Sequence, residues 1–129
     1  MKSKNGGEMA TVLIVEDEKD LCELIASQIE LIGLNAETSF SAEDAFEKIT
    51  SGKKFDLVIT DIRLPGMDGM EFIRKVKEER NEIPDFFVMT GFSDYQPEEI
   101  NCEVGNHLYL KPGGLSDLIG DIKAYFSVL

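Results

Sequence analysis

The sequence is short of basic residues, cysteine and long apolar runs, and each shortage excludes a class of protein. Lysine and arginine together number 13 among 129 residues, against 25 aspartates and glutamates, which gives a formal net charge of −12. A surface that neutralises a nucleic-acid backbone needs clustered basic side chains, so nucleic-acid binding is not expected. The same charge favours a basic or cation-bearing partner.

Cysteine is equally scarce. Cys22 and Cys102 lie far apart in a chain that is long enough to bury a sizeable core without disulfides. Two separated thiols indicate a reducing, cytoplasmic setting, and we expect both to be free and at least partly buried.

No apolar run approaches the length that spans a membrane. The first apolar segment is residues 11–15, and the polar stretch before it resembles neither a signal peptide nor an anchor. We expect residues 1–9 to be a flexible leader and residues 10–129 to form one domain. The chain stops just after its last expected helix, so we expect no room for a DNA-binding or catalytic output domain.

Strand-like and helix-like patterns alternate from residue 11 to the last residue. The expected strands are residues 11–15, 35–39, 55–60, 85–90 and 107–110. The expected helices are residues 19–32, 41–51, 72 to about 80, a short or irregular one within 92–105, and 115–129. This alternation predicts a doubly wound α/β fold, in which a parallel five-stranded sheet of order 2-1-3-4-5 has helices on both faces, as in flavodoxin.

Three carboxylates follow two strands that are neighbours in the expected sheet. Glu16 and Asp17 come directly after the first strand, and Asp61 comes after the third. Because the carboxyl ends of parallel strands meet at one edge, these groups should lie close together and repel one another. A divalent cation relieves that repulsion, and hard oxygen ligands favour Mg²⁺ over Zn²⁺, with Mn²⁺ as an alternative. The competing interpretation is that Asp17 simply caps the following helix.

Asp61 is also a candidate nucleophile, because a carboxylate beside a bound divalent cation can attack a phosphorus centre. Thr90 ends the fourth expected strand and Lys111 follows the fifth, so they supply a hydroxyl and an ammonium group for phosphoryl oxygens. Either residue alone is weak evidence, since threonine is a common strand residue and lysine a common solvated cap. Their shared placement after the strands is what indicates phosphoryl chemistry.

The sequence resembles the receiver domains of two-component response regulators over about residues 10–129. The matching segments are Glu16-Asp17-Glu18, DIRLPGMDG from Asp61 to Gly69, Thr90-Gly91 and Lys111-Pro112. The resemblance implies that Asp61 accepts a phosphoryl group from a phosphohistidine on a sensor histidine kinase or histidine phosphotransfer protein. It implies further that Thr90 and Lys111 bind the phosphoryl oxygens, and that the phosphorylated state changes binding to an output protein that the sequence does not identify.

The resemblance also implies the metal ligands. Asp17, Asp61 and the main-chain carbonyl of Arg63 would bind Mg²⁺ directly, with Glu16 acting through a water molecule. A receiver catalyses only its own phosphorylation and dephosphorylation, so we expect a signalling phosphoacceptor rather than an enzyme acting on other substrates.

The chain departs from the family pattern at the position three residues before the lysine. Receivers usually carry Tyr or Phe there as a rotamer switch, whereas this chain has Leu108, and Tyr109 is expected to face the opposite side of the strand. The resemblance implies that two further positions, Arg63 and Phe92, flank the path of an attacking water molecule. Their bulk predicts slow autodephosphorylation, over minutes or longer.

Three other functions compete with this interpretation. A degenerate receiver would act as a scaffold without being phosphorylated, which the altered switch position favours and the acidic cluster disfavours. A Mg²⁺-dependent phosphatase of the haloacid-dehalogenase type needs an acid two residues after the nucleophile, where this chain has Arg63. A flavodoxin-type electron carrier needs a glycine-rich phosphate loop after the first strand, where residues 16–20 would repel a phosphate.

Overall fold

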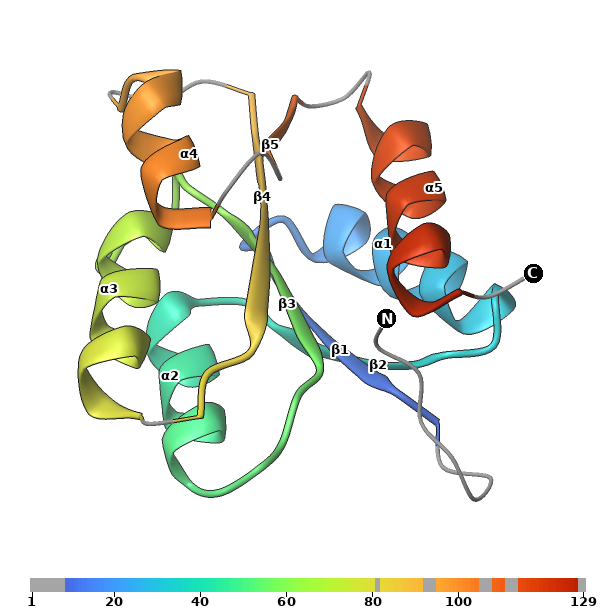
Figure 1. Cartoon of the computed structure of the whole chain (residues 1–129), viewed down its shortest axis with the longest axis horizontal. Helices are drawn as coiled ribbons and strands as arrows, with labels where there is room; N and C mark the ends of the chain where they lie inside the picture. The colour runs from blue at the N-terminus through green and yellow to red at the C-terminus, as the bar shows by residue number, and fades with distance from the viewer. Residues whose placement is uncertain (1–8, 81, 92–94, 105–107, 111–113, 128–129) are drawn as a thin grey trace.

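A parallel five-stranded sheet forms the centre of the computed structural model, which describes residues 9–80, 82–91, 95–104, 108–110 and 114–127, with backbone alone for 101–103 and 108–110 (Figure 1). The strands are β1 (Thr11–Val15), β2 (Asn35–Ser39), β3 (Leu57–Asp61), β4 (Asp85–Thr90) and β5 (Leu108–Leu110). Their order is β2-β1-β3-β4-β5, with every neighbouring pair parallel. The order predicted from the sequence is confirmed.

Within the described ranges, five helices cover the two faces of this sheet. They are α1 (Lys19–Leu31), α2 (Ala42–Thr50), α3 (Gly69–Glu79), α4 (Pro97–Val104) and α5 (Leu115–Phe126). Helices α1 and α5 lie on one face, and α2, α3 and α4 on the other (Figure 1). None of the helices in the described ranges is both long and apolar enough to cross a membrane.

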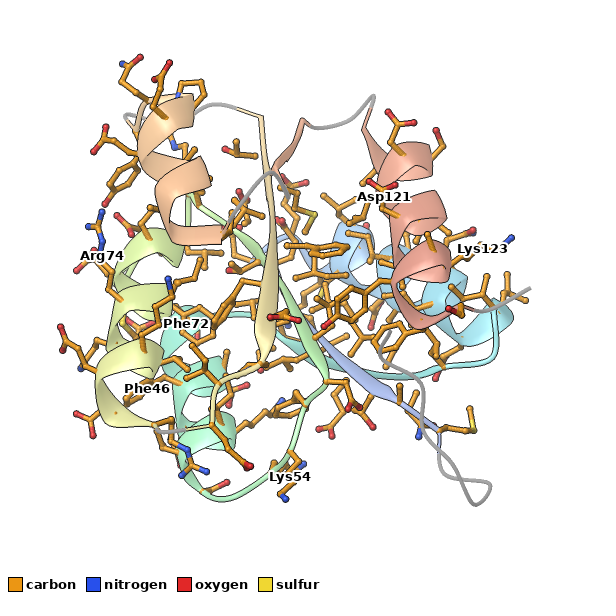
Figure 2. All side chains as sticks on the ribbon, viewed as in Figure 1. Phe46, Lys54, Phe72, Arg74, Asp121 and Lys123 are labelled. Carbon is orange, nitrogen blue, oxygen red and sulfur yellow. The ribbon has the colours of Figure 1, made fainter. Side chains whose placement is uncertain are left out.

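The central strands supply a core on each side of the sheet because side chains alternate along a strand. In β1, Leu13 and Val15 face α2, α3 and α4, whereas Val12 and Ile14 face α1 and α5. All four are fully buried, and burying one such aliphatic side chain stabilises a fold by about 1.5–3 kcal/mol. Phe72 of α3 lies in the first of these cores, and the half-buried Phe46 of α2 packs against the same core (Figure 2).

Helix ends follow the local signals in the sequence. Ser41 is the N-cap of α2, and its hydroxyl oxygen accepts a hydrogen bond of 3.1 Å from the Asp44 N–H. Helix α1 stops before Gly33, whose φ of +91° lies in the left-handed region that favours glycine after a helix.

Strand β3 begins two residues later and ends one residue later than the expected range 55–60. Pairing with β1 begins at Leu57, and pairing with β4 continues to Asp61, which lies opposite Met89. The candidate nucleophile is therefore the last residue of the strand rather than the residue after it, so the sheet fixes its backbone. The expected short helix within 92–105 is confirmed as α4.

Candidate functional site

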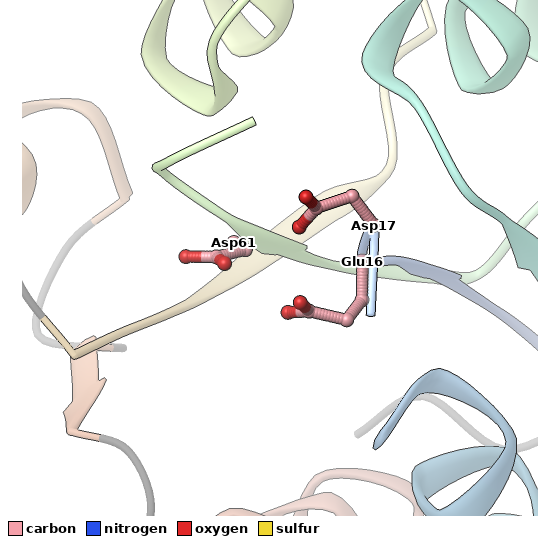
Figure 3. A group of neighbouring side chains, drawn as sticks. All are labelled: Glu16, Asp17 and Asp61. Carbon is pink, nitrogen blue, oxygen red and sulfur yellow. The ribbon is translucent and has the colours of Figure 1, made fainter. Parts of the chain in front are cut away.

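The three carboxylates expected at the carboxyl edge of the sheet do meet there. Glu16 and Asp17 follow β1 and Asp61 ends β3, and one carboxylate oxygen from each lies within 4.8 Å of the others. Figure 3 shows the three side chains projecting toward a common space beyond the strand ends. The pairing of Val15 with Thr60 explains the convergence, because it sets the residues that follow β1 beside the end of β3.

The members of this acidic cluster differ in their exposure. Glu16 is fully buried and Asp61 is 4% exposed, whereas Asp17 is open to solvent. The Glu16 N–H donates to the Ser39 carbonyl at 3.0 Å, and its Oε1 accepts from the Glu18 N–H at 3.2 Å. Two nearly buried carboxylates at this separation concentrate negative charge in a region of low dielectric constant, where a cation is strongly attracted.

The interpretation that Asp17 merely caps α1 is wrong. The N-cap residue of α1 is Glu18 rather than Asp17, and the Glu18 side chain makes no capping hydrogen bond. The Asp17 carboxylate instead lies at the mouth of an open pocket of about 580 Å³ that Asp61, Arg63 and Gly91 also line.

The backbone around Asp61 holds its carboxylate in place. The Arg63 N–H donates to Asp61 Oδ1 at 3.3 Å, and the buried Thr60 hydroxyl donates to the Asp61 carbonyl at 2.9 Å. The side chain of Arg63 is exposed at the rim of the pocket. Thr90 ends β4 and is buried, one residue beyond the Met89 that pairs with Asp61.

Several residues expected at the site are not characterised. Lys111 and Phe92 lie outside the described residues, as do the side chains of Leu108 and Tyr109, whose backbone forms part of β5. Their roles therefore stay predictions.

A buried thiol lies close to the acidic cluster. Cys22 is a free, fully buried cysteine, as expected, and its Sγ–H donates to the Ile14 carbonyl at 3.7 Å. Burial, reinforced by the charge of Glu16, raises its pKa to about 11. The thiol is therefore protonated at neutral pH.

Two side chains that the sequence did not single out contact the loop after Asp61. Glu43 of α2 accepts a hydrogen bond of 2.9 Å from the Met67 N–H, which lowers the pKa of Glu43. The Tyr95 hydroxyl donates to Asp68 Oδ2 at 2.8 Å, and that hydrogen bond raises the pKa of Tyr95. Neither contact has a local sequence signal, because each joins segments that meet only in the folded chain.

The donor set of the acidic cluster fits a hard divalent cation. Three carboxylate oxygens within 4.8 Å of one another match the ligands that Mg²⁺ takes in proteins, where the ion usually keeps several waters. Within the described part of the chain, this is the only group of three or more acidic, histidine or cysteine side chains arranged in this way.

Comparisons with known proteins agree with the fold and the acidic edge. The family model described as "Response regulator receiver domain" matches residues 12–123. The response regulator ArlR of Staphylococcus aureus is 28% identical over 117 residues, which are 90% of this chain and 52% of that protein. The chain thus spans about half the length of the curated relatives it matches.

Two solved structures are also similar. A CheY-like receiver domain protein from Methanospirillum hungatei JF-1 has a TM-score of 0.78 and 26% identity, over 92% of this chain and 94% of that one. The response regulator TrrA from Thermotoga maritima, in complex with Mg²⁺-BeF, has a TM-score of 0.77 and 26% identity. The match covers 90% of this chain and 98% of that one. With a family match over most of its length and this topology, the chain belongs to the response regulator receiver domains of two-component systems.

Proposed function

We propose that this signalling domain is a phosphoacceptor, in which Asp61 receives a phosphoryl group from a phosphohistidine of a sensor histidine kinase or histidine phosphotransfer protein. The observation that carries the proposal is the convergence of the Glu16, Asp17 and Asp61 carboxylates within 4.8 Å at the carboxyl edge of the sheet. The complex of the related TrrA with Mg²⁺-BeF gives independent support.

Mg²⁺ is the cofactor that the donor set favours, with Mn²⁺ as an alternative. Asp17, Asp61 and the main-chain carbonyl of Arg63 would hold the ion directly, and Glu16 would act through a water molecule. When bound, the ion neutralises negative charge on the phosphoryl oxygens and on the carboxylates.

The chain's own residues supply the nucleophile and its orientation. A carboxylate oxygen of Asp61 forms a bond to phosphorus as the phosphorus–nitrogen bond of the phosphohistidine breaks, and the imidazole leaves with that electron pair. The Arg63 N–H, at 3.3 Å from Asp61 Oδ1, fixes the orientation of the carboxylate before attack. The buried Thr90 hydroxyl and the predicted Lys111 ammonium group then bind phosphoryl oxygens.

The phosphorylated state would act by changing the binding of an output protein. The arrival of a phosphoryl group is reported by Thr90, which ends β4, and by Lys111, which follows β5 in the sequence. The reduced Cys22 thiol is consistent with a cytoplasmic setting, where the kinase or phosphotransfer protein would donate the group.

The lifetime of the phosphorylated state is expected to depend on the side chains beside the pocket. The exposed Arg63 side chain lines the pocket, and we expect it to cover part of the path of an attacking water molecule. Together with Phe92, it is expected to give a half-life of minutes or longer. Loss of phosphate from the isolated domain in Mg²⁺ measures this, and a half-life of a few seconds would count against it.

Acetyl phosphate tests the proposal directly. In Mg²⁺, the wild-type chain should gain the mass of one phosphoryl group, and Asp61→Asn should gain none. The matched control is Asp85→Asn, which makes the same change in an exposed residue at the opposite end of the sheet. Equal phosphorylation of wild type and Asp61→Asn would contradict the proposal. If neither protein is phosphorylated, the result would favour a scaffold that does not accept a phosphoryl group.

A further inference from the structure

The loop that follows the phosphoacceptor, residues 62–68 and here named the acceptor loop, is closed at its base. The Gly69 N–H donates to the Ile62 carbonyl at 2.9 Å and so joins the two ends of the loop. A Cβ atom at Gly69 would lie 2.2 Å from the Asp61 carbonyl oxygen, so the start of α3 packs directly on the backbone of Asp61. Displacement of the acceptor loop therefore moves Arg63, whose N–H orients the Asp61 carboxylate.

Glu43 holds the loop from the side of α2. Its Oε2 accepts from the Met67 N–H at 2.9 Å, and a Cβ atom at Gly66 would lie 2.5 Å from the same oxygen. The carboxylate thus lies against the chain at two successive residues. A hydrogen bond to an ionised carboxylate is shorter and stronger than one to a neutral acceptor.

Tyr95 holds the loop from the side of α4. Its hydroxyl donates to Asp68 Oδ2 at 2.8 Å, while Oδ1 of the same carboxylate accepts from the Glu71 N–H at 2.8 Å and so caps α3. The Arg74 guanidinium of α3 lies 5.9 Å from the centre of the Tyr95 ring, on the outer side of the helix (Figure 2). The ring is therefore fixed to both the cap and the body of α3.

We propose that Glu43 and Tyr95 are positioning residues that hold the acceptor loop in the geometry in which Asp61 and Arg63 bind Mg²⁺ and the phosphoryl group. This role rests on the proposed phosphoacceptor function. Irregular loops are the least stable parts of a fold, so a loop that must present a backbone carbonyl accurately needs support from outside itself. The two contacts come from opposite sides and from segments that are separate in sequence, so neither replaces the other.

The test compares Glu43→Ala and Tyr95→Phe, singly and together, with matched controls. Glu47→Ala removes an exposed glutamate from the same helix, and Tyr125→Phe removes a phenol that donates to Asp85 at the far end of the sheet. The readouts are the Mg²⁺ dissociation constant of the unphosphorylated protein and the hydrogen-exchange rate of the Met67 amide. We expect each test variant to bind Mg²⁺ about 3- to 10-fold more weakly, toward the low end of the effects of outer-shell partners.

The double variant should lose more affinity than either single variant, and Glu43→Gln, which keeps an acceptor oxygen, should recover most of the loss. The Met67 amide should exchange faster in Glu43→Ala and not in the two controls. Mg²⁺ affinity and exchange rates equal to those of the controls would overturn the positioning role, as would a failure of wild type to bind Mg²⁺. If wild type binds Mg²⁺ but accepts no phosphoryl group, only the proposed function fails.

Discussion

Gly69 stands where the first turn of α3 meets the backbone of Asp61, and no side chain fits there. A Cβ atom would lie 2.2 Å from the Asp61 carbonyl oxygen and 2.9 Å from the Ile62 Cα, and neither atom belongs to a flexible side chain. The strand that ends in the phosphoacceptor and the helix after it are thus in direct backbone contact.

Replacing Gly69 by alanine is therefore expected to lower the free energy of unfolding by about 3 kcal/mol, the upper part of the usual range for overpacking. The matched control is Gly120→Ala, because Gly120 lies in the exposed middle of α5 with nothing within 4 Å of a Cβ atom. That change should raise stability by up to about 1 kcal/mol. Urea denaturation measures both, and equal effects would show that the contact at Gly69 is relieved without cost.

Cys22 should be unreactive in the folded protein, because burial raises its pKa to about 11. In a Cys102→Ser background, iodoacetamide at pH 8 should modify Cys22 far more slowly than in urea, as measured by intact mass. Rapid alkylation of the folded chain would contradict this.

The same shift makes stability depend on pH. The folded-state pKa of about 11 is above the ordinary value of 9.0, so the protonated thiol is the form that the fold favours. Its contribution to the free energy of unfolding is complete below pH 9.0 and is lost as the pH rises through about 11.

Individual residues differ in how far the sequence predicts them. The convergence of Glu16, Asp17 and Asp61 was predictable because strand ends and sheet order fix it. Glu43 and Tyr95 were not, because an exposed glutamate on a helix and a tyrosine before a helix have no local pattern that names a distant partner.

At the scale of elements, the start of α3 is held by more side-chain hydrogen bonds than the start of α2. Asp68 and Glu71 form a reciprocal capping box, and Asp68 also accepts the Tyr95 hydroxyl. Helix α2, in comparison, has a single capping hydrogen bond from Asp44 to Ser41.

Asp68→Ala is expected to lower the free energy of unfolding by about 2 kcal/mol, at the upper end of the range for N-cap residues, because two hydrogen bonds, from the Glu71 N–H and the Tyr95 hydroxyl, depend on that side chain. Ser41→Ala, which removes one capping bond, should cost about 1 kcal/mol or less. Chemical denaturation of the two variants checks the order, and a larger loss at Ser41 would contradict the account of the α3 cap.

Element boundaries were harder to predict than elements. The expected range 55–60 for β3 counted apolar residues, whereas hydrogen-bonded pairing extends the strand to Asp61 and leaves Phe55 outside it. A polar residue at a strand end carries no hydrophobic signal, so only its pairing partner reveals that it belongs to the sheet.

For the whole molecule, Mg²⁺ should raise stability by mass action, since the acidic cluster exists only in the folded chain. At 100 times the dissociation constant, the expected gain is about 2.7 kcal/mol. Thermal unfolding at constant ionic strength measures this gain in stability. NaCl is the control, because salt by itself screens the net charge of −12 and so changes the stability of the chain. Asp17→Asn should reduce the gain, and an equal gain in NaCl would contradict a specific site.

The closed base of the acceptor loop limits how this part of the molecule can evolve. Because a backbone hydrogen bond from Gly69 to Ile62 joins its two ends, an insertion or deletion between them changes the span that this bond must close. A replacement at an exposed position such as Pro65 leaves that span unchanged. Descendants of this domain can therefore alter the composition of the loop far more readily than its length.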